Sequence, residues 1–142
     1  MIVKPWTKGD THRLSLQSNQ TYHEDTLNEE TDFSELAEQG LALTFEHDGE
    51  VMMIAGLAPQ WKNRAIAWTL ISKNAGRHFV ELHRYVDNFL NTSDFDRIES
   101  MVDVGFEAGH RWMKMLGFET EGYMRKYRPD GGDMVLYARI RQ

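Results

Sequence analysis

The sequence predicts a single α+β domain, residues 1–142, built on a mixed sheet. Two observations support this class. Three β-prone runs follow one another between residues 41 and 71, and a long amphipathic helix then leads into a further strand. The last third of the chain repeats the pattern with a short helix and a closing hairpin. The predicted order is β-α-α-β-β-β-α-β-α-β-β.

The composition fits a folded protein and excludes several kinds of site. The chain has 142 residues, of which 41% are hydrophobic and 11% aromatic, enough for a real core. It has no cysteine, which excludes disulfides, thiolate nucleophiles and Cys-ligated metals, and suits a reducing interior. No apolar run approaches the roughly 18 residues of a membrane span, and no signal-peptide pattern is present. We therefore expect a cytoplasmic protein that does not enter the membrane.

The net charge of −6 is unevenly distributed. Residues 1–50 carry 11 acidic and 3 basic side chains, whereas residues 51–142 carry 11 acidic and 13 basic ones. An acidic half disfavours nucleic acid and attracts a cationic substrate or a basic protein surface. The alternative interpretation is a solvated face that keeps the protein soluble.

The first 40 residues predict a strand and two short helices. The strand covers Met1–Trp6. Asp10 is expected to be the N-cap of a helix that carries Leu14 and Leu16. Asp32 is expected to cap a second helix that ends at Gly40.

The next three runs predict an antiparallel meander. Leu41–Phe45 and Val51–Leu57 are joined by a turn containing Asp-Gly, a strong hairpin signal. A loop holding Pro59 and Trp61 is expected to precede the third run, Ala65–Ile71.

The remaining elements alternate helix and strand. The spacing of apolar residues predicts a helix over Arg77–Leu90, and a strand follows at Arg97–Val104 with Ile98, Val102 and Val104 on one side. A short helix from Glu107 has Ala108, Trp112 and Met115 on one side. Gly117 is expected to end it in a left-handed conformation, with Phe118 packing back on the last turn. Thr120–Tyr127 and Met134–Ile140 form the closing hairpin.

A helix, then Leu116-Gly117-Phe118, then a strand with Gly122, in this order of elements, resembles the GNAT-type N-acetyltransferases. The resemblance implies an acyl-CoA-dependent N-acyltransferase with acetyl-CoA or another acyl-CoA as co-substrate. It also implies that the fourth and fifth strands are parallel and splay apart to form the cofactor cleft. Pantetheine would then pair with the edge of the fourth strand, at Trp68, Leu70 and Ile71.

The resemblance places the pyrophosphate at the start of the helix after the fourth strand. The usual Gln/Arg-x-x-Gly-x-Gly/Ala signature is absent, and Ser72–His78 stands in its place. Within it Gly76 permits close backbone approach, and Lys73 and Arg77 can neutralise phosphate charge. These three residues and His78 are the predicted phosphate-binding residues, and a plain helix start with solvated cations is the alternative.

The family's catalytic residues do not carry over. Phe106 and Met113 stand where the family usually has Asn and Tyr, and neither can donate a proton. Acyl transfer to an amine still needs a base and, less strictly, an acid. Glu99 on the fifth strand, His110 on the last helix and Tyr123 on the sixth strand are the predicted substitutes. A lone histidine on a short helix is otherwise a surface or packing residue.

Other chemistries are disfavoured. The six histidines lack metal-ligand spacing, so no metal is expected, and no nucleophile-elbow pattern is present. A narrower resemblance, from Val104-Gly105 through His110–Lys114 to Leu116-Gly117, is to small GNAT-like proteins of T7-type tailed bacteriophages. That resemblance implies a viral protein of the host cytoplasm or the virion. The alternative function is a catalytically inactive binding module, and either a monomer or a homodimer is compatible with the sequence.

Overall fold

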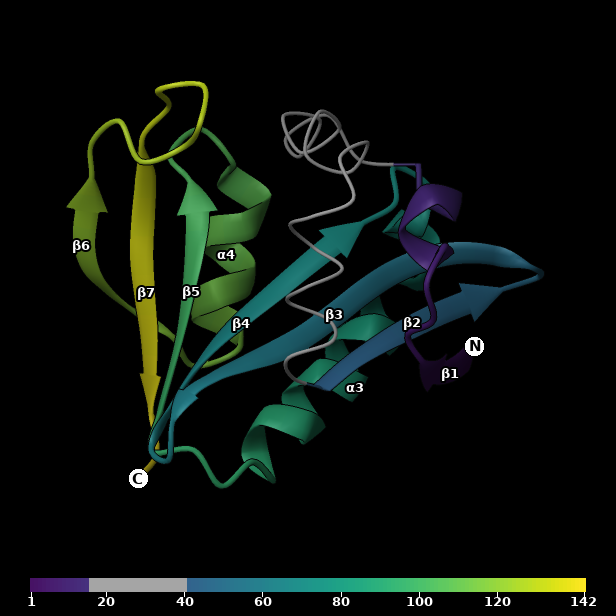
Figure 1. Ribbon diagram of the computed structural model, residues 1–142, viewed down its shortest axis with the longest axis horizontal. Helices are drawn as coiled ribbons and strands as arrows, with labels where there is room; N and C mark the ends of the chain where they lie inside the picture. The colour runs from purple at the N-terminus through teal and green to yellow at the C-terminus, as the bar shows by residue number, and fades with distance from the viewer. Residues whose placement is uncertain (16–40) are drawn as a thin grey trace. The chain divides into compact units, whose positions relative to one another are not determined.

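The structure is a computed structural model that describes residues 1–15 and 41–142 (Figure 1). Seven strands form one mixed sheet in the order β1-β2-β3-β4-β5-β7-β6. The strands are β1 (Ile2–Pro5), β2 (Leu41–His47), β3 (Glu50–Trp61), β4 (Arg64–Ile71), β5 (Arg97–Asp103), β6 (Glu119–Met124) and β7 (Met134–Ile140). The helices are η1 (Asp10–Arg13), η3 (Ala75–His78), α3 (Phe79–Asn91) and α4 (Glu107–Met115). The predicted α+β class and mixed sheet are confirmed.

The chain divides into two compact units. Unit 1 comprises Met1–Ala58 and Trp68–Ser93, and unit 2 comprises Pro59–Ala67 and Asp94–Gln142. β4 therefore begins in unit 2 and ends in unit 1. The helix predicted after Asp32, and the part of the first helix at Leu16, lie outside the described residues.

Unit 1 is organised by the hairpin of β2 and β3. Thr44 pairs with Ile54 and Phe45 with Met53, but Glu46 pairs with Val51, so a β-bulge lies at this step. Side chains alternate between faces along a regular strand, and the extra residue shifts that alternation. Val51 and Ile54, three residues apart, can therefore join the same core cluster with Leu14 and Leu70.

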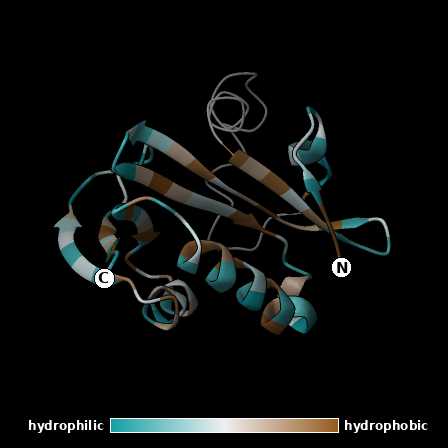
Figure 2. Ribbon diagram, turned by 90° about the horizontal axis from the view of Figure 1, so that it is seen from below, coloured by the Kyte–Doolittle hydropathy of each residue, from teal (hydrophilic) through white to brown (hydrophobic). Residues whose placement is uncertain are grey.

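The two faces of the β2–β3 hairpin are covered differently. α3 lies on one face, where the rings of Phe45 and Tyr85 meet edge to face at 5.1 Å (Figure 1). η1 is joined to the other face, where Thr44 Oγ1 donates to Asp10 Oδ2 at 2.9 Å. Hydrophobic and hydrophilic residues alternate along the strands and helices, as Figure 2 shows. Unit 1 therefore has packed residues on both faces of the β2–β3 hairpin.

The prediction that Asp10 caps its helix is wrong. Gly9, with φ of 102°, is the N-cap, and Asp10 is the first residue of the 3-10 helix. Its carboxylate instead accepts hydrogen bonds from Thr7 N (2.9 Å) and Thr44 Oγ1. Asp10 is buried, so these partners satisfy a charge that water does not reach.

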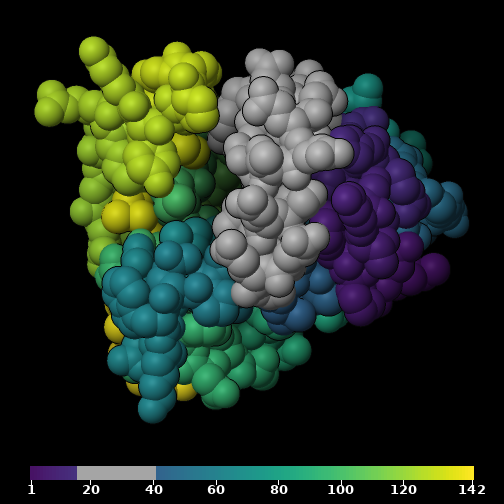
Figure 3. Space-filling model, viewed as in Figure 1, coloured from purple at the N-terminus to yellow at the C-terminus, as the bar shows by residue number. Residues whose placement is uncertain are grey.

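The predicted loop around Pro59 and Trp61 is also wrong. β3 continues through both residues, and only a short turn separates it from β4. Trp61, 62% exposed, is stacked by the Arg64 guanidinium 4.7 Å from its ring centroid. The tip of this hairpin reaches the surface drawn in Figure 3.

Unit 2 is built around β5. β5 pairs in parallel with the start of β4, from Arg64 with Arg97 to Ile66 with Glu99, which confirms the predicted parallel pair. On its other side β5 pairs antiparallel with β7, and β7 with β6. Val104, predicted to share a side with Ile98 and Val102, lies beyond the end of the strand and is 40% exposed.

α4 ends as the sequence predicts. Gly117 has φ of 86°, its N–H donates to Lys114 O (3.1 Å), and Phe118 N–H donates to Met113 O (2.9 Å). These two bonds make a Schellman motif, and both Phe118 and Met113 are buried.

The inward face of α4 differs from the predicted one. Ala108 and Met115 are exposed, whereas Gly109, Trp112 and Met113 are buried. At Gly109 an added Cβ would come within 2.7 Å of the Phe106 ring. Because Gly109 has no side chain, the Phe106 ring can pack directly against this turn of α4.

Gly56 provides a test of packing in unit 1. A Cβ there would lie 2.7 Å from both the Trp68 ring and Leu41 O. We expect Gly56→Ala to lower the free energy of unfolding by about 1–3 kcal/mol, because the backbone oxygen cannot move aside cheaply. Urea denaturation measures it, with Gly122→Ala as control because no atom lies within 4 Å of its added Cβ. Equal stability of both variants would contradict this packing.

Candidate functional site

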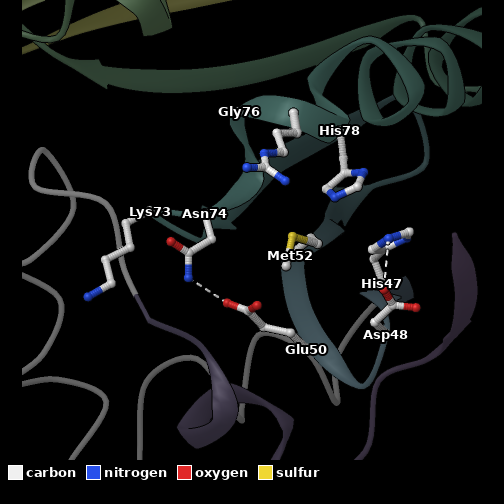
Figure 4. A pocket seen from close by; sticks show the side chains of 9 residues that line it. His47, Asp48, Glu50, Met52, Lys73, Asn74, Gly76 and His78 are labelled. Carbon is white, nitrogen blue, oxygen red and sulfur yellow. Dashed lines mark hydrogen bonds and ion pairs between the residues drawn. The ribbon is translucent and has the colours of Figure 1, made fainter.

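A pocket of about 590 Å³ opens in unit 1 between two segments far apart in the sequence (Figure 4). One wall is the β2–β3 turn with the start of β3. The other is the connection from β4 through η3. The lining residues are His47, Asp48, Glu50, Met52, Lys73, Asn74, Gly76, Arg77 and His78.

The hairpin wall is a tight turn held from outside the pocket. Asp48 and Gly49 have φ of 50° and 79°, and positive φ at both central residues is what a type I′ turn requires. Arg13 on η1 donates to Gly49 O (3.2 Å) and to Glu46 Oε1 (2.8 Å). Arg13 thus ties the turn to η1 through the backbone of Gly49 and through the side chain of Glu46 on β2.

The second wall is fixed by backbone hydrogen bonds. Ser72 N donates to Met52 O (2.8 Å), which joins the end of β4 to β3. Ser72 Oγ accepts from Asn74 N (3.0 Å), and Ala75 N donates to Ser72 O (3.1 Å). Across the pocket, Asn74 Nδ2 donates to Glu50 Oε1 at 2.6 Å (Figure 4).

The electrostatic character of the pocket is mixed. Lys73 and Arg77 are exposed cations on the helical wall. The rings of His47 and His78 meet across the two walls in a tilted contact, with centroids 4.1 Å apart and an interplanar angle of 37°. His47 Nε2 is also 3.3 Å from the Asp48 carboxylate. The site offers an anion the exposed positive charges of Lys73 and Arg77, which are opposed by the carboxylates of Asp48 and Glu50.

The four predicted phosphate-binding residues therefore meet in one pocket. Lys73, Gly76, Arg77 and His78 all line it, and a Cβ built at Gly76 meets no atom within 4 Å. The opposite wall of the pocket, His47 to Met52, was not predicted from the sequence. The Asp-Gly turn located that hairpin, but nothing in the sequence placed it beside the start of η3.

The three strand residues predicted to bind pantetheine have mainly buried side chains. Leu70 is 0% exposed and belongs to the core cluster of unit 1, against which Trp68 packs. Ile71 is buried as well. A ligand would meet these residues through their backbone groups, and that role stays a prediction.

Glu99 lies within a network of arginines in unit 2. Arg64 donates to both carboxylate oxygens, through Nη2 to Oε1 at 2.9 Å and through Nε to Oε2, and Arg97 Nε donates to Oε2 at 2.8 Å. Arg97 also forms an ion pair with Glu121. The hydrogen bonds from Arg64, followed by those from Arg97, lower the pKa of Glu99 to about 2 although burial opposes this. Such a carboxylate is a weak base.

His110 has a defined tautomer. Its Nε2 lies 3.0 Å from Val104 O, which can only accept, so Nε2 carries a proton. Its Nδ1 lies 2.8 Å from the Tyr137 hydroxyl, which can donate to this nitrogen when the ring proton is on Nε2. Tyr137 is buried on β7 and was not singled out from the sequence, because its partner is 27 residues away.

Tyr123 is engaged at the surface of unit 2. Its hydroxyl donates to Asp133 Oδ2 at 2.8 Å, and Lys126 N donates to Asp133 Oδ1 at 2.8 Å. The hydrogen bond to Asp133 raises the pKa of Tyr123 above its usual value.

No group of three His, Cys, Asp or Glu residues suited to a metal occurs within residues 1–15 and 41–142. In the same ranges no helix combines the length and apolarity needed to cross a membrane.

The Glu99 network predicts an acid-sensitive stability. A folded-state pKa near 2, below the unfolded value of about 4.3, means that Glu99 stabilises the fold above the unfolded pKa. That contribution, on the order of 2 kcal/mol, is lost as the pH falls from about 5 to 2. We expect Glu99→Gln to be less stable at pH 7 and to lose less stability on acidification, as measured by urea midpoints. The exposed Glu119→Gln is the control, and a wild-type pH profile shared by both variants would refute this role.

The hydrogen bonds of His110 predict a spectroscopic signature. The ¹⁵N shifts of its ring should show a proton on Nε2, because Val104 O can only accept a hydrogen bond. Tyr137→Phe should move the Nδ1 resonance and lower the free energy of unfolding by about 1 kcal/mol, because one hydrogen bond is lost. Tyr127→Phe, at an exposed site, should change neither. A proton found on Nδ1 would overturn the assignment.

Comparison with known proteins identifies the fold. No protein-family model matches the sequence, and no curated protein does. Among solved structures, Ard1 from Thermoplasma volcanium superposes with a TM-score of 0.74 at 13% identity, covering 99% of this chain and 97% of that one. The IAA acetyltransferase from Bacillus cereus gives 0.73 at 11%, covering 99% of each chain. A GNAT family acetyltransferase from Elizabethkingia anophelis, solved with acetyl-CoA bound, gives 0.71 at 10%, covering 99% of this chain and 97% of that chain. The chain has the fold of the GNAT-family N-acetyltransferases.

Proposed function

We propose that this protein is an acyl-CoA-dependent N-acyltransferase of divergent GNAT type, with acetyl-CoA as co-substrate. The observation that carries the proposal is the pocket in unit 1. Lys73, Gly76, Arg77 and His78 line it together, at the connection after β4 where the resemblance places the pyrophosphate. The acetyl-CoA-bound structure from Elizabethkingia anophelis, which shares the fold, supports the choice of ligand.

The residues present fit a phosphate-bearing ligand. Lys73 and Arg77 would neutralise phosphate charge, and the open space at Gly76 lets a ligand approach the backbone. Acetyl-CoA supplies the acetyl group as a thioester. The chain must orient it, bind the amine and provide for the proton that the amine loses on attack.

Three residues remain proposed for proton handling. Glu99, His110 and Tyr123 each have polar partners within unit 2, and they differ in what they offer. Glu99 is a weak base because two arginines hold its charge. Tyr123 holds its proton more firmly through Asp133. His110 offers a ring nitrogen, Nδ1, that would become available to an amine proton if the Tyr137 hydroxyl turned away.

The proposed acceptor is an amine of a small molecule or of a basic protein surface. The support is the charge of the first 50 residues, with 11 acidic and 3 basic side chains. Acidic side chains raise the local concentration of cationic amines and make their binding sensitive to salt.

A second function has its own support. Phe106 and Met113 cannot donate protons, and the internal hydrogen bonds of Glu99, His110 and Tyr123 hold unit 2 together. An inactive binding module of the kind suggested by the phage resemblance, engaging a host or virion protein, needs no proton donor. It would still require a partner surface of positive charge.

The proposal is tested by calorimetry with acetyl-CoA, CoA and ADP. We expect micromolar binding of all three, because they share the pyrophosphate. Lys73→Ala with Arg77→Ala should weaken each by at least about tenfold, since one charge-assisted hydrogen bond contributes about 1.5 kcal/mol. Lys62→Ala, in the turn between β3 and β4, is the control that removes a positive charge outside the pocket. Absence of binding at millimolar ligand would exclude the enzyme, and acetyl transfer to a panel of amines would separate enzyme from binding module.

A further inference from the structure

The chain contains two Asp-Gly sequences, Asp48-Gly49 and Asp130-Gly131, and no Asn-Gly sequence. The first forms the turn between β2 and β3, and the second lies between β6 and β7. In such a sequence the glycine amide nitrogen can attack the aspartate side chain, because glycine has no Cβ to obstruct the approach. Both sites have the same reacting groups, so their surroundings decide which one reacts.

The reaction is an isomerisation that needs only water. At the first site Gly49 N attacks Asp48 Cγ, an N–C bond forms, and the carboxyl hydroxyl leaves as water with the amide proton. The resulting five-membered succinimide then takes up one water. Attack at Cγ restores aspartate. Attack at the Asp48 main-chain carbonyl breaks its bond to Gly49 N, and the chain then runs through Cγ as isoaspartate.

Asp130 is held at both of its reacting groups. Its carboxylate accepts hydrogen bonds from Arg128 Nε and Nη2, both at 2.9 Å, and from Gly132 N at 3.0 Å. Its nucleophile, Gly131 N, donates to Arg128 O at 2.9 Å. The hydrogen bond from Arg128 also lowers the pKa of Asp130, and a carboxylate loses an oxygen less readily than the acid does. Succinimide formation at Asp130 therefore requires several of these bonds to break.

Arg128 is itself firmly placed. Its side chain is 17% exposed, and its Nη1 donates to Asp103 Oδ1 at 2.6 Å. A Cβ added at Gly132 would overlap its guanidinium, so the group packs directly on the glycine backbone. The hydrogen bonds that hold Asp130 thus come from a side chain that is fixed to the end of β5.

Asp48 is held far less. Its side chain is 91% exposed and lies 3.3 Å from His47 Nε2 (Figure 4). Its φ of 50° is left-handed, which is unfavourable for a residue with a Cβ, so a departure from the turn relieves strain. Arg13 Nη2 donates to Gly49 O at 3.2 Å, but this bond is exposed and water can replace it. Bringing Asp48 Cγ to Gly49 N therefore disrupts little of the structure.

We propose that Asp48 is a site of spontaneous covalent modification, at which the folded protein forms isoaspartate while Asp130 is protected. The modification would alter the pocket, because Asp48 lines it. Isoaspartate adds one backbone carbon to a two-residue turn, whose length fixes the pairing of His47 with Glu50. This inference does not depend on which ligand the pocket binds.

The experiment measures isoaspartate at each site over time. The whole protein is incubated at neutral pH, both folded and in guanidinium chloride, then cleaved and sequenced by mass spectrometry with electron-transfer fragmentation. In the folded protein we expect isoaspartate to form at least about tenfold faster at Asp48 than at Asp130, the factor for one hydrogen bond to a charged group. In guanidinium chloride the two rates should be similar, because the hydrogen bonds are lost.

Matched variants test the cause of the difference. Arg128→Ala should speed the reaction at Asp130 and leave Asp48 unchanged. Arg125→Ala, at an exposed position of the same connection, is the control and should change neither rate. Asp48→Glu should form no comparable product at position 48, because its ring would need six members. Circular dichroism verifies each fold, and the comparison of folded with unfolded wild type tests the proposal even if Arg128→Ala unfolds.

The possible results are distinct. Equal rates at the two sites of the folded protein, or a faster rate at Asp130, would overturn the proposal. So would isoaspartate that appears at Asp48 only in guanidinium chloride, because the β2–β3 turn would then be the protected one. An unchanged Asp130 rate in folded Arg128→Ala would refute the protection by Arg128. No result of this experiment bears on acetyl-CoA binding, so the proposed function stands or falls separately.

Discussion

The buried carboxylate of Glu99 joins β4 to β5 in unit 2 through ion pairs with two arginines. A charge removed from water must be matched, and Glu99 is matched by Arg64 from β4 and by Arg97 from its own strand. Arg97 in turn reaches Glu121 on β6. The network fixes the place where β4 and β5 run in parallel, because Glu99 lies opposite Ile66 in that ladder. Removing Glu99 would take this counter-charge from both Arg64 and Arg97.

The same reasoning distinguishes residues that hold the fold from residues available to a ligand. In unit 2 the polar groups of Glu99, His110 and Tyr123 are used by partners on neighbouring strands or turns. In unit 1 the exposed cations Lys73 and Arg77 line an open pocket. Chemistry that depends on binding is therefore best sought in unit 1, while proton transfer in unit 2 requires one of its hydrogen bonds to be exchanged.

Local signals in the sequence predicted much of the fold. Asp48-Gly49 located the first hairpin and Gly117 the end of α4. The four residues predicted to bind phosphate line one pocket, and their role stays a prediction. Long-range features could not be read in this way. Pro59 continues β3 because tertiary pairing overrides its local preference, and His47 meets His78 only through the fold. Tyr137 was not predicted for the same reason, because its role depends on its contact with His110 on α4, which lies far away in the sequence.

The division of β4 between the two units has a genetic consequence. Unit 2 includes Pro59–Ala67, a segment inserted within the sequence of unit 1, so no single cut in the chain separates one unit from the other. A polypeptide beginning at Asp94 would lack Arg64, the main partner of Glu99. Two fragments divided after Ser93 would place Pro59–Ala67 and the rest of unit 2 on different polypeptides. Recombination that exchanged either half for a homologous piece would have to preserve the register between Arg64 and Arg97.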